Sequence, residues 1–489
     1  MTSTGSSGTT TSRPARWEYD PAPVPAALAD VRPNYRPFVD GRFVDGAGEP
    51  LHPVNPATEE VLTEVATAGP ADVDTAVQAA RRALEQGWGS LRGVERARRL
   101  HRIAELLQQR SQELAVLESL DSGKPIREAT QDVSSAAAHF FHYAGWADKL
   151  EYAGYGPNPR PVGVVAQIVP SDLPLLLAAR MVAPALACGS SVILKPAAST
   201  PLTALVLAEI CREAELPAGA LNVLPGDGGV GAALAEHPGV DAVAFSGSAE
   251  VGRRIRQATA GSDRRLLLEL GGAGVNVVFD DAPLDQAVEG VVTGACLHRG
   301  QARGAGSRLL VQESIAEELT DRLRTRLATL RVGDPLDPNT ELGALGSRRR
   351  LDRVRELLAN AEAEGARRWS SPYPLPDRGY FLAATMLSDV QQSMRVAREE
   401  IRGPVVSVLT FRTPEEAVTK ANATPHGLTA GVWTEKGSRA LWTAQRLRAG
   451  VVWANTFHRL DPTAPVGARR ESGFGHQNGP AGLEAYLDA

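Results

Sequence analysis

The chain has 489 residues, of which 43% are hydrophobic and 22% are charged, and its formal net charge is −5. This length predicts more than one packed core, and the interspersed acidic and basic residues leave no broad positive field for nucleic acid or anionic lipid. Its three cysteines, Cys188, Cys211 and Cys296, are too few and too scattered for a disulfide framework or a zinc site. We therefore expect a cytoplasmic protein with no metal, no nucleic acid and no membrane among its partners.

Residues 1–34 are predicted to be a disordered or partner-packing tail. The first residues are rich in Ser, Thr and Gly and lack the apolar segment of a signal peptide. The part from Trp17 to Asn34 contains aromatic residues and prolines without periodicity. It should lack a core of its own and pack on a neighbouring surface wherever it is ordered.

Regular structure is expected from residue 35 onward. The Asp-Gly pair in 35–50, between short alternating runs, predicts a hairpin, and apolar residues at helical spacing predict helices over 71–88 and 93–123. From residue 161, short Val- and Ile-rich strands alternate with helices, which is typical of α/β proteins with parallel sheets. The basic run at 346–357 is interpreted as the solvated face of a helix.

Several motifs carry candidate site residues. A strand ending near Gly247 runs into Ser248 and a helix containing Gly252, an arrangement that brings backbone N–H groups to a phosphate. Lys195 directly follows another strand, where it could reach a ribose or a phosphate, although a surface lysine has the same pattern. Glu269 ends an apolar run before two glycines, a setting in which desolvation makes a carboxylate a usable base. Glu400 and Asn455 lie in further motifs of this kind.

Taken in order, the segments "PVNPATEEV", "ALACGSSVILKPA", "AFSGSAEVG", "LELGG" and "PVGARRESGFG" resemble the aldehyde dehydrogenase superfamily. The resemblance implies an α/β aldehyde dehydrogenase fold with three parts: a Rossmann-like nucleotide domain (35–147 and 160–269), a catalytic-type domain (270–463), and a small oligomerisation element (148–159 and 464–489). The segments "WEYDP", "LVQES" and "NGPAGLEAYL" look closest to the sixteenth aldehyde dehydrogenase family, some members of which lack the catalytic nucleophile.

In active relatives, the resemblance implies that a cysteine thiolate attacks the aldehyde, an Asn amide holds the oxyanion, a nicotinamide accepts hydride, and a Glu activates water. Here Arg303 stands at the cysteine position and Asp172 at the Asn position. A guanidinium stays protonated and has no lone pair for a carbonyl carbon. Cys296 lies about two helical turns, roughly 10 Å, upstream and is interpreted as a core residue.

Other positions of the family pattern are changed as well. Ser171 replaces a tryptophan, Arg402 replaces the aromatic residue beside the nicotinamide, and Ala198 replaces a glutamate that binds the adenosine ribose. The retained residues are Glu269 at the catalytic end and, as candidate cofactor contacts, Lys195, Gly247, Ser248, Gly252 and Glu400. NAD or NADP is therefore the expected cofactor, with binding weakened or lost, especially for the cationic nicotinamide near Arg303 and Arg402.

These observations predict a catalytically inactive subunit or scaffold, a homo-oligomer or a hetero-oligomer with an active aldehyde dehydrogenase. The alternative is an NAD(P)-dependent aldehyde dehydrogenase that oxidises an aldehyde to a carboxylic acid with a displaced nucleophile. The segment at 151–160 looks shorter than the hairpin of many relatives, and Pro157 and Pro159 limit strand pairing there. The two new charges should also close the vacated pocket as a salt bridge between Arg303 and Asp172, with Glu269 as a second candidate partner.

Overall fold

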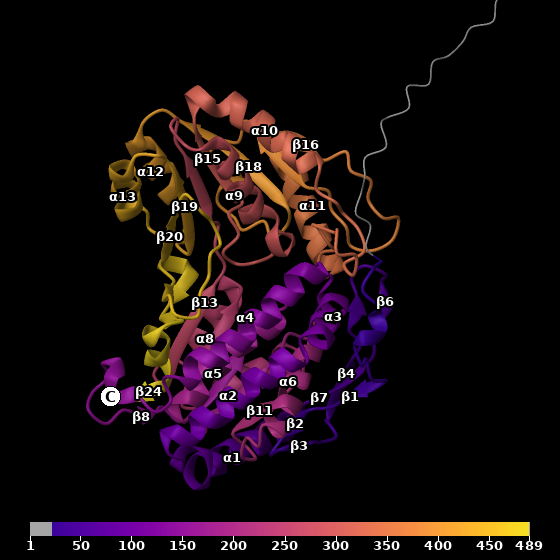
Figure 1. Ribbon diagram of the computed structural model, residues 1–489, viewed down its shortest axis with the longest axis vertical. Helices are drawn as coiled ribbons and strands as arrows, with labels where there is room; N and C mark the ends of the chain where they lie inside the picture. Colours follow the sequence, from indigo (N-terminus) through magenta and orange to yellow (C-terminus); the bar gives the residue numbers. More distant parts are fainter. Residues whose placement is uncertain (1–21, 489) are drawn as a thin grey trace, which may run out of the picture.

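The computed structural model describes residues 22–488 as two α/β lobes, one above the other in Figure 1. The predicted α/β architecture with parallel sheets is confirmed, and the strands expected after residue 161 all form. Where the sequence predicted a long helical stretch at 93–123, the structure has two helices, because the backbone turns out of helical geometry at Arg110 (φ −97°, ψ 19°).

The first lobe is built on an eight-stranded sheet in the order β22-β13-β12-β9-β10-β11-β2-β3. Its five central strands are parallel, and β2, β3 and β22 add antiparallel edges. The strands are β2 (Phe38–Val39), β3 (Arg42–Phe43), β9 (Val164–Ile168), β10 (Ser191–Lys195), β11 (Leu221–Val223), β12 (Ala242–Gly247), β13 (Arg265–Leu270) and β22 (Gly473–Phe474). The predicted hairpin is β2–β3, whose turn residues Asp40 and Gly41 both have positive φ, as a tight two-residue turn requires.

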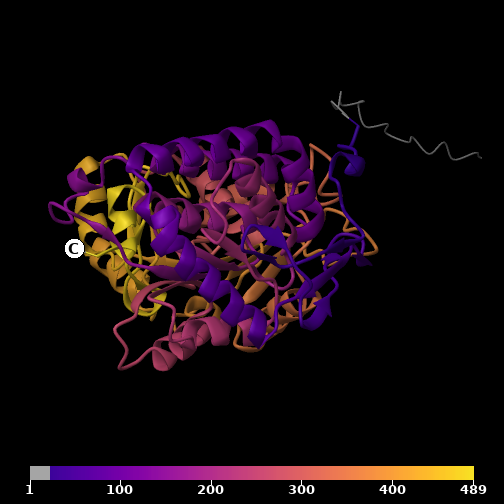
Figure 2. The same ribbon diagram turned by 90° about the horizontal axis from the view of Figure 1, so that it is seen from below.

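Helices cover both faces of this sheet (Figures 1 and 2). In β9, Val164 and Ala166 pack in one core with α1, α7 and α8, whereas Val165 packs in the opposite core with α2–α6. This alternation places one strand between two apolar layers, as expected for a parallel sheet. The helices are α1 (Pro70–Gln86), α2 (Gly93–Gln109), α3 (Ser111–Ser122), α4 (Ile126–Ala144), α5 (Pro174–Cys188), α6 (Leu202–Glu213), α7 (Gly228–Glu236) and α8 (Ala249–Ala258).

The second lobe contains a seven-stranded sheet in the order β16-β17-β18-β15-β14-β19-β20, parallel except for β16. Its strands are β14 (Val275–Val278), β15 (Arg308–Gln312), β16 (Arg367–Ser370), β17 (Thr385–Ser388), β18 (Val405–Phe411), β19 (Thr429–Trp433) and β20 (Val451–Ala454). Its helices are α9 (Leu284–Cys296), α10 (Ala316–Ala328), α11 (Arg348–Ala363), α12 (Pro414–Asn422) and α13 (Gly437–Arg446). Apolar side chains of α9 and α10 share one core, and those of α11 and α12 share the other.

Small sheets join the remaining segments. Their strands are β1 (Asn34–Tyr35), β4 (Gly48–Leu51), β5 (Val54–Asn55), β6 (Glu60–Val61), β7 (Glu64–Thr67), β8 (Arg160–Pro161), β21 (Val466–Gly467), β23 (His476–Gln477) and β24 (Leu487–Asp488). Strand β24, in the C-terminal segment of the proposed oligomerisation element, pairs with β8, which directly follows the element's other segment (148–159). The C-terminal segment also contributes β22, which extends the eight-stranded sheet of the first lobe by pairing with β13.

The predicted tail is only partly described by the structure, since Trp17 and the residues before 22 lie outside the described range. Residues 22–34 have no core of their own and run along the folded body. The Val24 N–H donates to the Leu336 carbonyl at 2.9 Å, and Arg32 forms a bidentate ion pair with Glu209. This part therefore packs on the body of its own chain, and the assignment of 1–34 to a disordered or partner-packing tail stays a prediction. Among the described residues, no helix is long and apolar enough to cross a membrane.

Candidate functional site

The candidate site lies where loops of the two lobes meet. Asp172 lies in the loop between β9 and α5, two residues before the helix begins. Glu269 is the next-to-last residue of β13, just before the chain crosses to the second lobe. Arg303 follows the short helix η4 (Leu297–Gly300). Since β9 and β13 belong to the same parallel sheet, their carboxyl ends bring Asp172 and Glu269 to one edge. A cavity of about 40 Å³ at this edge is lined by both acids and by Arg303.

Arg303 and Asp172 form a buried ion pair. The Nη2 of Arg303 lies 3.4 Å from Oδ2 of Asp172, and the two side chains are only 4% and 3% exposed. Burial alone would raise the pKa of Asp172, but the guanidiniums of Arg303, Arg402 and Arg350 hold that pKa below its ordinary value. Asp172 is therefore ionised, and the predicted salt bridge between Arg303 and Asp172 is confirmed.

Glu269, the second candidate partner of Arg303 in the sequence analysis, pairs with Arg180 instead. Its Oε1 accepts from Nη1 of Arg180 at 3.4 Å, and both side chains are nearly buried. Arg180 also donates through Nε to Asn478 at 3.1 Å, so the C-terminal segment fixes its orientation. Arg180 is the one arginine in the apolar run at 174–194. A single arginine in such a run could have indicated a buried carboxylate partner. In this arrangement Glu269 is a charge-paired carboxylate and does not contact Arg303 as an ion pair.

Two more arginines surround the same region. Nε of Arg402 lies 2.8 Å from Oε2 of Glu400. Arg350 lies at the start of α11. Burial lowers its pKa to about 10, although the negative charges of Asp172 and Glu400 act to raise that pKa. The interpretation of the basic run at 346–357 as wholly solvated is wrong at Arg350, although Arg348 and Arg349 are exposed. Helical periodicity alone did not separate these three neighbours, because the charged groups that act on Arg350, such as Arg402 and Asp172, come from distant parts of the chain.

A second buried charged group lies behind η4. Lys124 donates to Glu118 at 2.8 Å and to Asp132 at 2.5 Å, and all three side chains are buried. Glu128 accepts from the backbone N–H of His298 at 3.1 Å, and burial raises its pKa to about 7 even though Arg299 acts in the opposite direction. None of these residues was identified from the sequence, since each looks like an ordinary polar residue of a helix.

The backbone of η4 explains why Arg299 is buried. His298, Arg299 and Gly300 have φ of 51°, 61° and 66°, so three successive residues are left-handed. At Gly300 a Cβ atom would lie 2.1 Å from the Gly403 carbonyl oxygen, so only glycine permits this close approach. The turn directs the Arg299 side chain inward, where it is 1% exposed.

No thiol is poised for nucleophilic attack. Cys188, Cys211 and Cys296 are all buried. Burial raises the pKa of Cys296, the last residue of α9, to about 12, so its thiolate is scarce at neutral pH. Cys296 packs in the apolar core with α9 and α10, which confirms its interpretation as a core residue. Asn455 is also structural, because its side chain exchanges two 3.0 Å hydrogen bonds with the backbone of Thr434.

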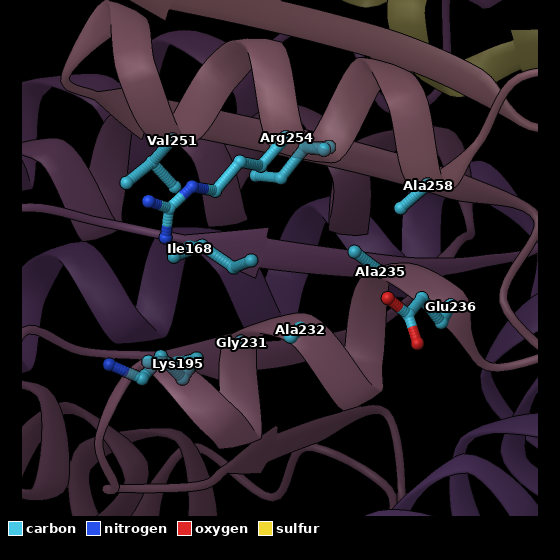
Figure 3. Close-up of a pocket in the computed structure, with 11 residues that line it drawn as sticks. Ile168, Lys195, Gly231, Ala232, Ala235, Glu236, Val251, Arg254 and Ala258 are labelled. Atoms are coloured by element: carbon cyan, nitrogen blue, oxygen red, sulfur yellow. The ribbon is translucent and has the colours of Figure 1, made fainter.

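Of the candidate nucleotide contacts, Lys195 lines a separate cavity of about 240 Å³ between α7 and α8 (Figure 3), whereas Gly247, Ser248 and Gly252 do not line it. Its walls are mostly apolar, with Ile168 between Val251 of α8 and Ala235 of α7. Lys195 lies at one end of this cavity, and burial lowers its pKa to about 8, opposed by Asp227. The Lys195 side chain is therefore buried, and the interpretation as a surface lysine is wrong.

The turn residues near this cavity serve the packing of α8. Ser248 caps the helix, its Oγ accepting from the Val251 N–H at 3.3 Å. A Cβ at Gly252 would lie 2.5 Å from Leu270, and a Cβ at Gly247 would lie 2.2 Å from Phe245. These glycines therefore allow α8 to pack closely on the strands. Glu400 does not line this cavity. It pairs with Arg402, on the side of the site where Arg303 lies.

Comparison with known proteins agrees with this arrangement. The sequence model of the aldehyde dehydrogenase family matches residues 43–489. Retinal dehydrogenase 2 of Homo sapiens is 39% identical over 499 residues, covering 97% of this chain and 96% of that protein. A structure of aldehyde dehydrogenase from Bacillus cereus in complex with NAD+ has a TM-score of 0.91 and 35% identity, covering 96% of this chain and 98% of that chain. An NAD-dependent aldehyde dehydrogenase from Sinorhizobium meliloti has a TM-score of 0.90 and 38% identity, with 94% of both chains covered.

Proposed function

The chain belongs to the aldehyde dehydrogenase family, and we propose that it is a catalytically inactive member, a subunit or scaffold that assembles with an active aldehyde dehydrogenase. The observation that carries this proposal is the ion pair between Arg303 and Asp172. If Arg303 stands at the position of the catalytic cysteine, the pocket has lost its nucleophile and holds a paired, buried guanidinium instead. An anionic Asp172 would also repel a developing oxyanion.

The cofactor site fits only part of NAD or NADP. The cavity between α7 and α8 has apolar walls and a buried lysine, which suit an adenosine and its phosphate. The other end presents Arg303 and Arg402, two cations that disfavour the cationic ring of an oxidised nicotinamide. We expect oxidised NAD to bind no more tightly than ADP-ribose by calorimetry. Micromolar affinity for NAD with its nicotinamide ordered beside Arg303 would contradict this.

A second candidate function is NAD(P)-dependent oxidation of an aldehyde to a carboxylic acid. The family match and the relatives' names support this candidate more directly than they support an inactive subunit. Its chemistry would need a nucleophile from elsewhere, and Cys296 is the thiol nearest in sequence to Arg303. Glu269 would then be the base, although its pairing with Arg180 ties up one carboxylate oxygen.

Aldehyde oxidation by the purified chain separates the two candidates. We expect no NADH or NADPH formation over a panel of aliphatic and aromatic aldehydes, with Cys296→Ser behaving like the unmodified chain. Cys211→Ser is the matched control, because Cys211 is also buried and lies in the first lobe. Turnover that Cys296→Ser abolishes and Cys211→Ser preserves would establish the second candidate.

Assembly is supported by the surface around the C-terminal segment. A groove of about 490 Å³ beside β8 and β24 is lined by Tyr155, Phe474 and Leu487, and the Phe474 side chain is 40% exposed. Exposed apolar surface beside a sheet edge is typical of an interface. Native mass spectrometry should show oligomers of the chain, alone or with a co-expressed aldehyde dehydrogenase, that Phe474→Glu weakens. Leu375→Glu, at a side chain exposed to 39%, should leave the oligomers unchanged.

The closer relationship to the sixteenth aldehyde dehydrogenase family belongs to this proposal as well. It is supported by "LVQES" and "NGPAGLEAYL" and by the arginine in the catalytic motif. The segment "WEYDP" lies outside the described residues. A cytoplasmic location is proposed from the low cysteine content.

A further inference from the structure

The small cavity beside Arg303 is lined by two ion pairs. Its volume is about 40 Å³, and Arg303, Asp172, Arg180 and Glu269 all line it. Arg303 pairs with Asp172 and Arg180 pairs with Glu269, each at 3.4 Å. The exposed fractions of these four side chains lie between 3% and 12%. The cavity therefore brings two cations and two anions together in a region from which water is largely excluded.

Hydrogen-bonding atoms of both kinds are left over on these residues. Nε and Nη1 of Arg303 and Nη2 of Arg180 are buried donors that have no hydrogen-bond partner among residues 22–488. Oδ2 of Asp172 and Oε2 of Glu269 are buried acceptors without a partner in the same part of the chain. Because unsatisfied buried polar atoms are costly, we expect a molecule in the cavity to supply their partners.

The mixture of donors and acceptors disfavours a simple ion in this cavity. An anion would face the free oxygens of Asp172 and Glu269, and a cation would face the guanidiniums of Arg303 and Arg180. His458 also lines the cavity, and burial lowers its pKa to about 4, so it adds no charge at neutral pH. Three further arginines of this region do not line the cavity: Arg299, Arg350 and Arg402. A neutral molecule that both donates and accepts hydrogen bonds fits best.

The size and the walls of the cavity narrow the class of this molecule. A volume of about 40 Å³ corresponds to roughly three waters of about 10–15 Å³ each, and a carboxamide group has a similar number of heavy atoms. Apolar side chains complete the walls: Leu173, Leu177, Leu428, Trp453, Leu460 and Val466. Leu460 is 41% exposed, so its wall of the cavity lies at the surface. An apolar chain attached to a carboxamide could leave the cavity on that side.

We propose that this cavity binds the primary carboxamide group of a small apolar amide. The carbonyl oxygen accepts from Arg303 or Arg180, and the two N–H groups donate to Asp172 and Glu269. A primary carboxamide is uncharged and carries two donors beside an acceptor with two lone pairs, so it matches the leftover atoms in kind. The site goes beyond the proposed role of an inactive subunit, and it requires neither a thiol nor a bound nicotinamide.

Three probes of the same shape test this site on the full-length chain. Butyramide, 2-pentanone and butyrate differ only in the group beside the carbonyl, which is an amino group, a methyl group or a charged oxygen. Ligand-observed NMR titrations should show saturable binding of butyramide. The ketone should bind at least about tenfold more weakly, because it leaves both carboxylate oxygens without a donor. Butyrate should be weaker by a similar factor, because it brings a negative charge to Asp172 and Glu269.

Two results with these probes would overturn the proposal. If butyramide shows no saturable binding, the cavity holds water alone. If the three probes bind with equal affinity, the leftover polar atoms do not select the ligand. Formation of NADH or NADPH is measured separately, so the amide site stands or fails whether or not the chain oxidises aldehydes.

The surface side of the cavity is tested with two exposed leucines. Leu460 lines the cavity, whereas Leu441, on α13 and 60% exposed, does not. Leu460→Trp should weaken butyramide binding by about tenfold or more, because the larger indole fills the space beside it, and Leu441→Trp should leave binding unchanged. Both variants should melt close to the unmodified chain, since both side chains are exposed. Unchanged affinity in Leu460→Trp would place the amide elsewhere and overturn the proposal.

The polar part of the cavity is tested with Glu269→Gln. This variant keeps the size of the side chain but loses the charged acceptor, so the preference for butyramide over 2-pentanone should fall by about threefold or more. Glu250→Gln is the matched control, because Glu250 is exposed, pairs with Arg254 and does not line the cavity. An unchanged preference in Glu269→Gln would contradict the proposed contact between the amide and this carboxylate.

Discussion

The two cavities of the candidate site differ in size and in charge. The cavity between α7 and α8 is mostly apolar, and its one buried cation, Lys195, forms no ion pair within 4.0 Å in the described part of the chain. The end beside Arg303 is small and crowded with charge, and Arg303 is paired with Asp172. The difference shows that an apolar cavity with a single buried cation and a small cavity crowded with ion pairs lie in the same molecule.

The largest expected effect comes from removing the carboxylate at the crowded end. Asp172→Asn leaves Arg303 buried without its counter-ion, so the free energy of unfolding should fall by about 3 kcal/mol or more. Denaturant unfolding followed by circular dichroism measures this. Asp285→Asn is the control, because it breaks the exposed 2.6 Å pair with Arg322 and should cost about 1 kcal/mol or less. Equal losses in the two variants would mean that burial of the pair has no energetic consequence.

The buried Glu128 should make stability depend on pH. Its pKa is raised from 4.5 to about 7, so between these values the folded chain holds a proton that the unfolded chain has lost. The free energy of unfolding should therefore fall as pH rises through this window, by about 3 kcal/mol at most. Glu128→Gln should remove that decline, measured by denaturant unfolding across the window. Glu105→Gln, at a half-exposed side chain, should retain it.

At the apolar end, Lys195→Met should weaken binding of ADP by about tenfold, because one charge-assisted contact to a phosphate is lost. The pKa of Lys195 is lowered to about 8, so ADP binding to the unmodified chain should also weaken as pH rises through that value. Calorimetry at several pH values checks both effects. Lys149→Met, at an exposed lysine, serves as the control. Unchanged affinity in Lys195→Met would show that the cavity does not bind the phosphates through Lys195.

The smallest effect on catalytic activity is expected for Arg303→Cys. Under the proposed function, aldehyde oxidation should stay at or near zero, because Asp172 would still stand in place of the oxyanion donor and Arg402 in place of the residue beside the nicotinamide. Steady-state assays of NADH and NADPH formation measure this directly. Substantial turnover in Arg303→Cys would show that the rest of the catalytic machinery is intact.

The sequence was sufficient to predict the α/β fold class, because the local patterns of strands and helices along the chain agree with the tertiary structure. Short Val- and Ile-rich strands that alternate with helices reappear as β9–β15, the helices predicted over 71–88 and 93–123 appear as α1, α2 and α3, and the opposite charges of Asp172 and Arg303 were enough to predict their pairing. The neighbours of that pair were not predictable in the same way. Arg350 looks like its exposed neighbour Arg349, and the charged groups that act on it come from distant parts of the chain. Arg180 draws Glu269 away from Arg303 through a contact between α5 and β13 that no local spacing encodes.

The central claim is that Arg303 and Asp172 changed together into one buried ion pair, and a double-mutant cycle tests it most directly. Thermal and denaturant unfolding of Arg303→Cys, Asp172→Asn and the double variant give the coupling energy between the two side chains. Each single variant should be less stable than the unmodified chain, and the double variant should regain part of the loss, with a favourable coupling of about 1–3 kcal/mol. Losses that add to within about 0.5 kcal/mol would contradict the account, because they would mean that the two charges are independent.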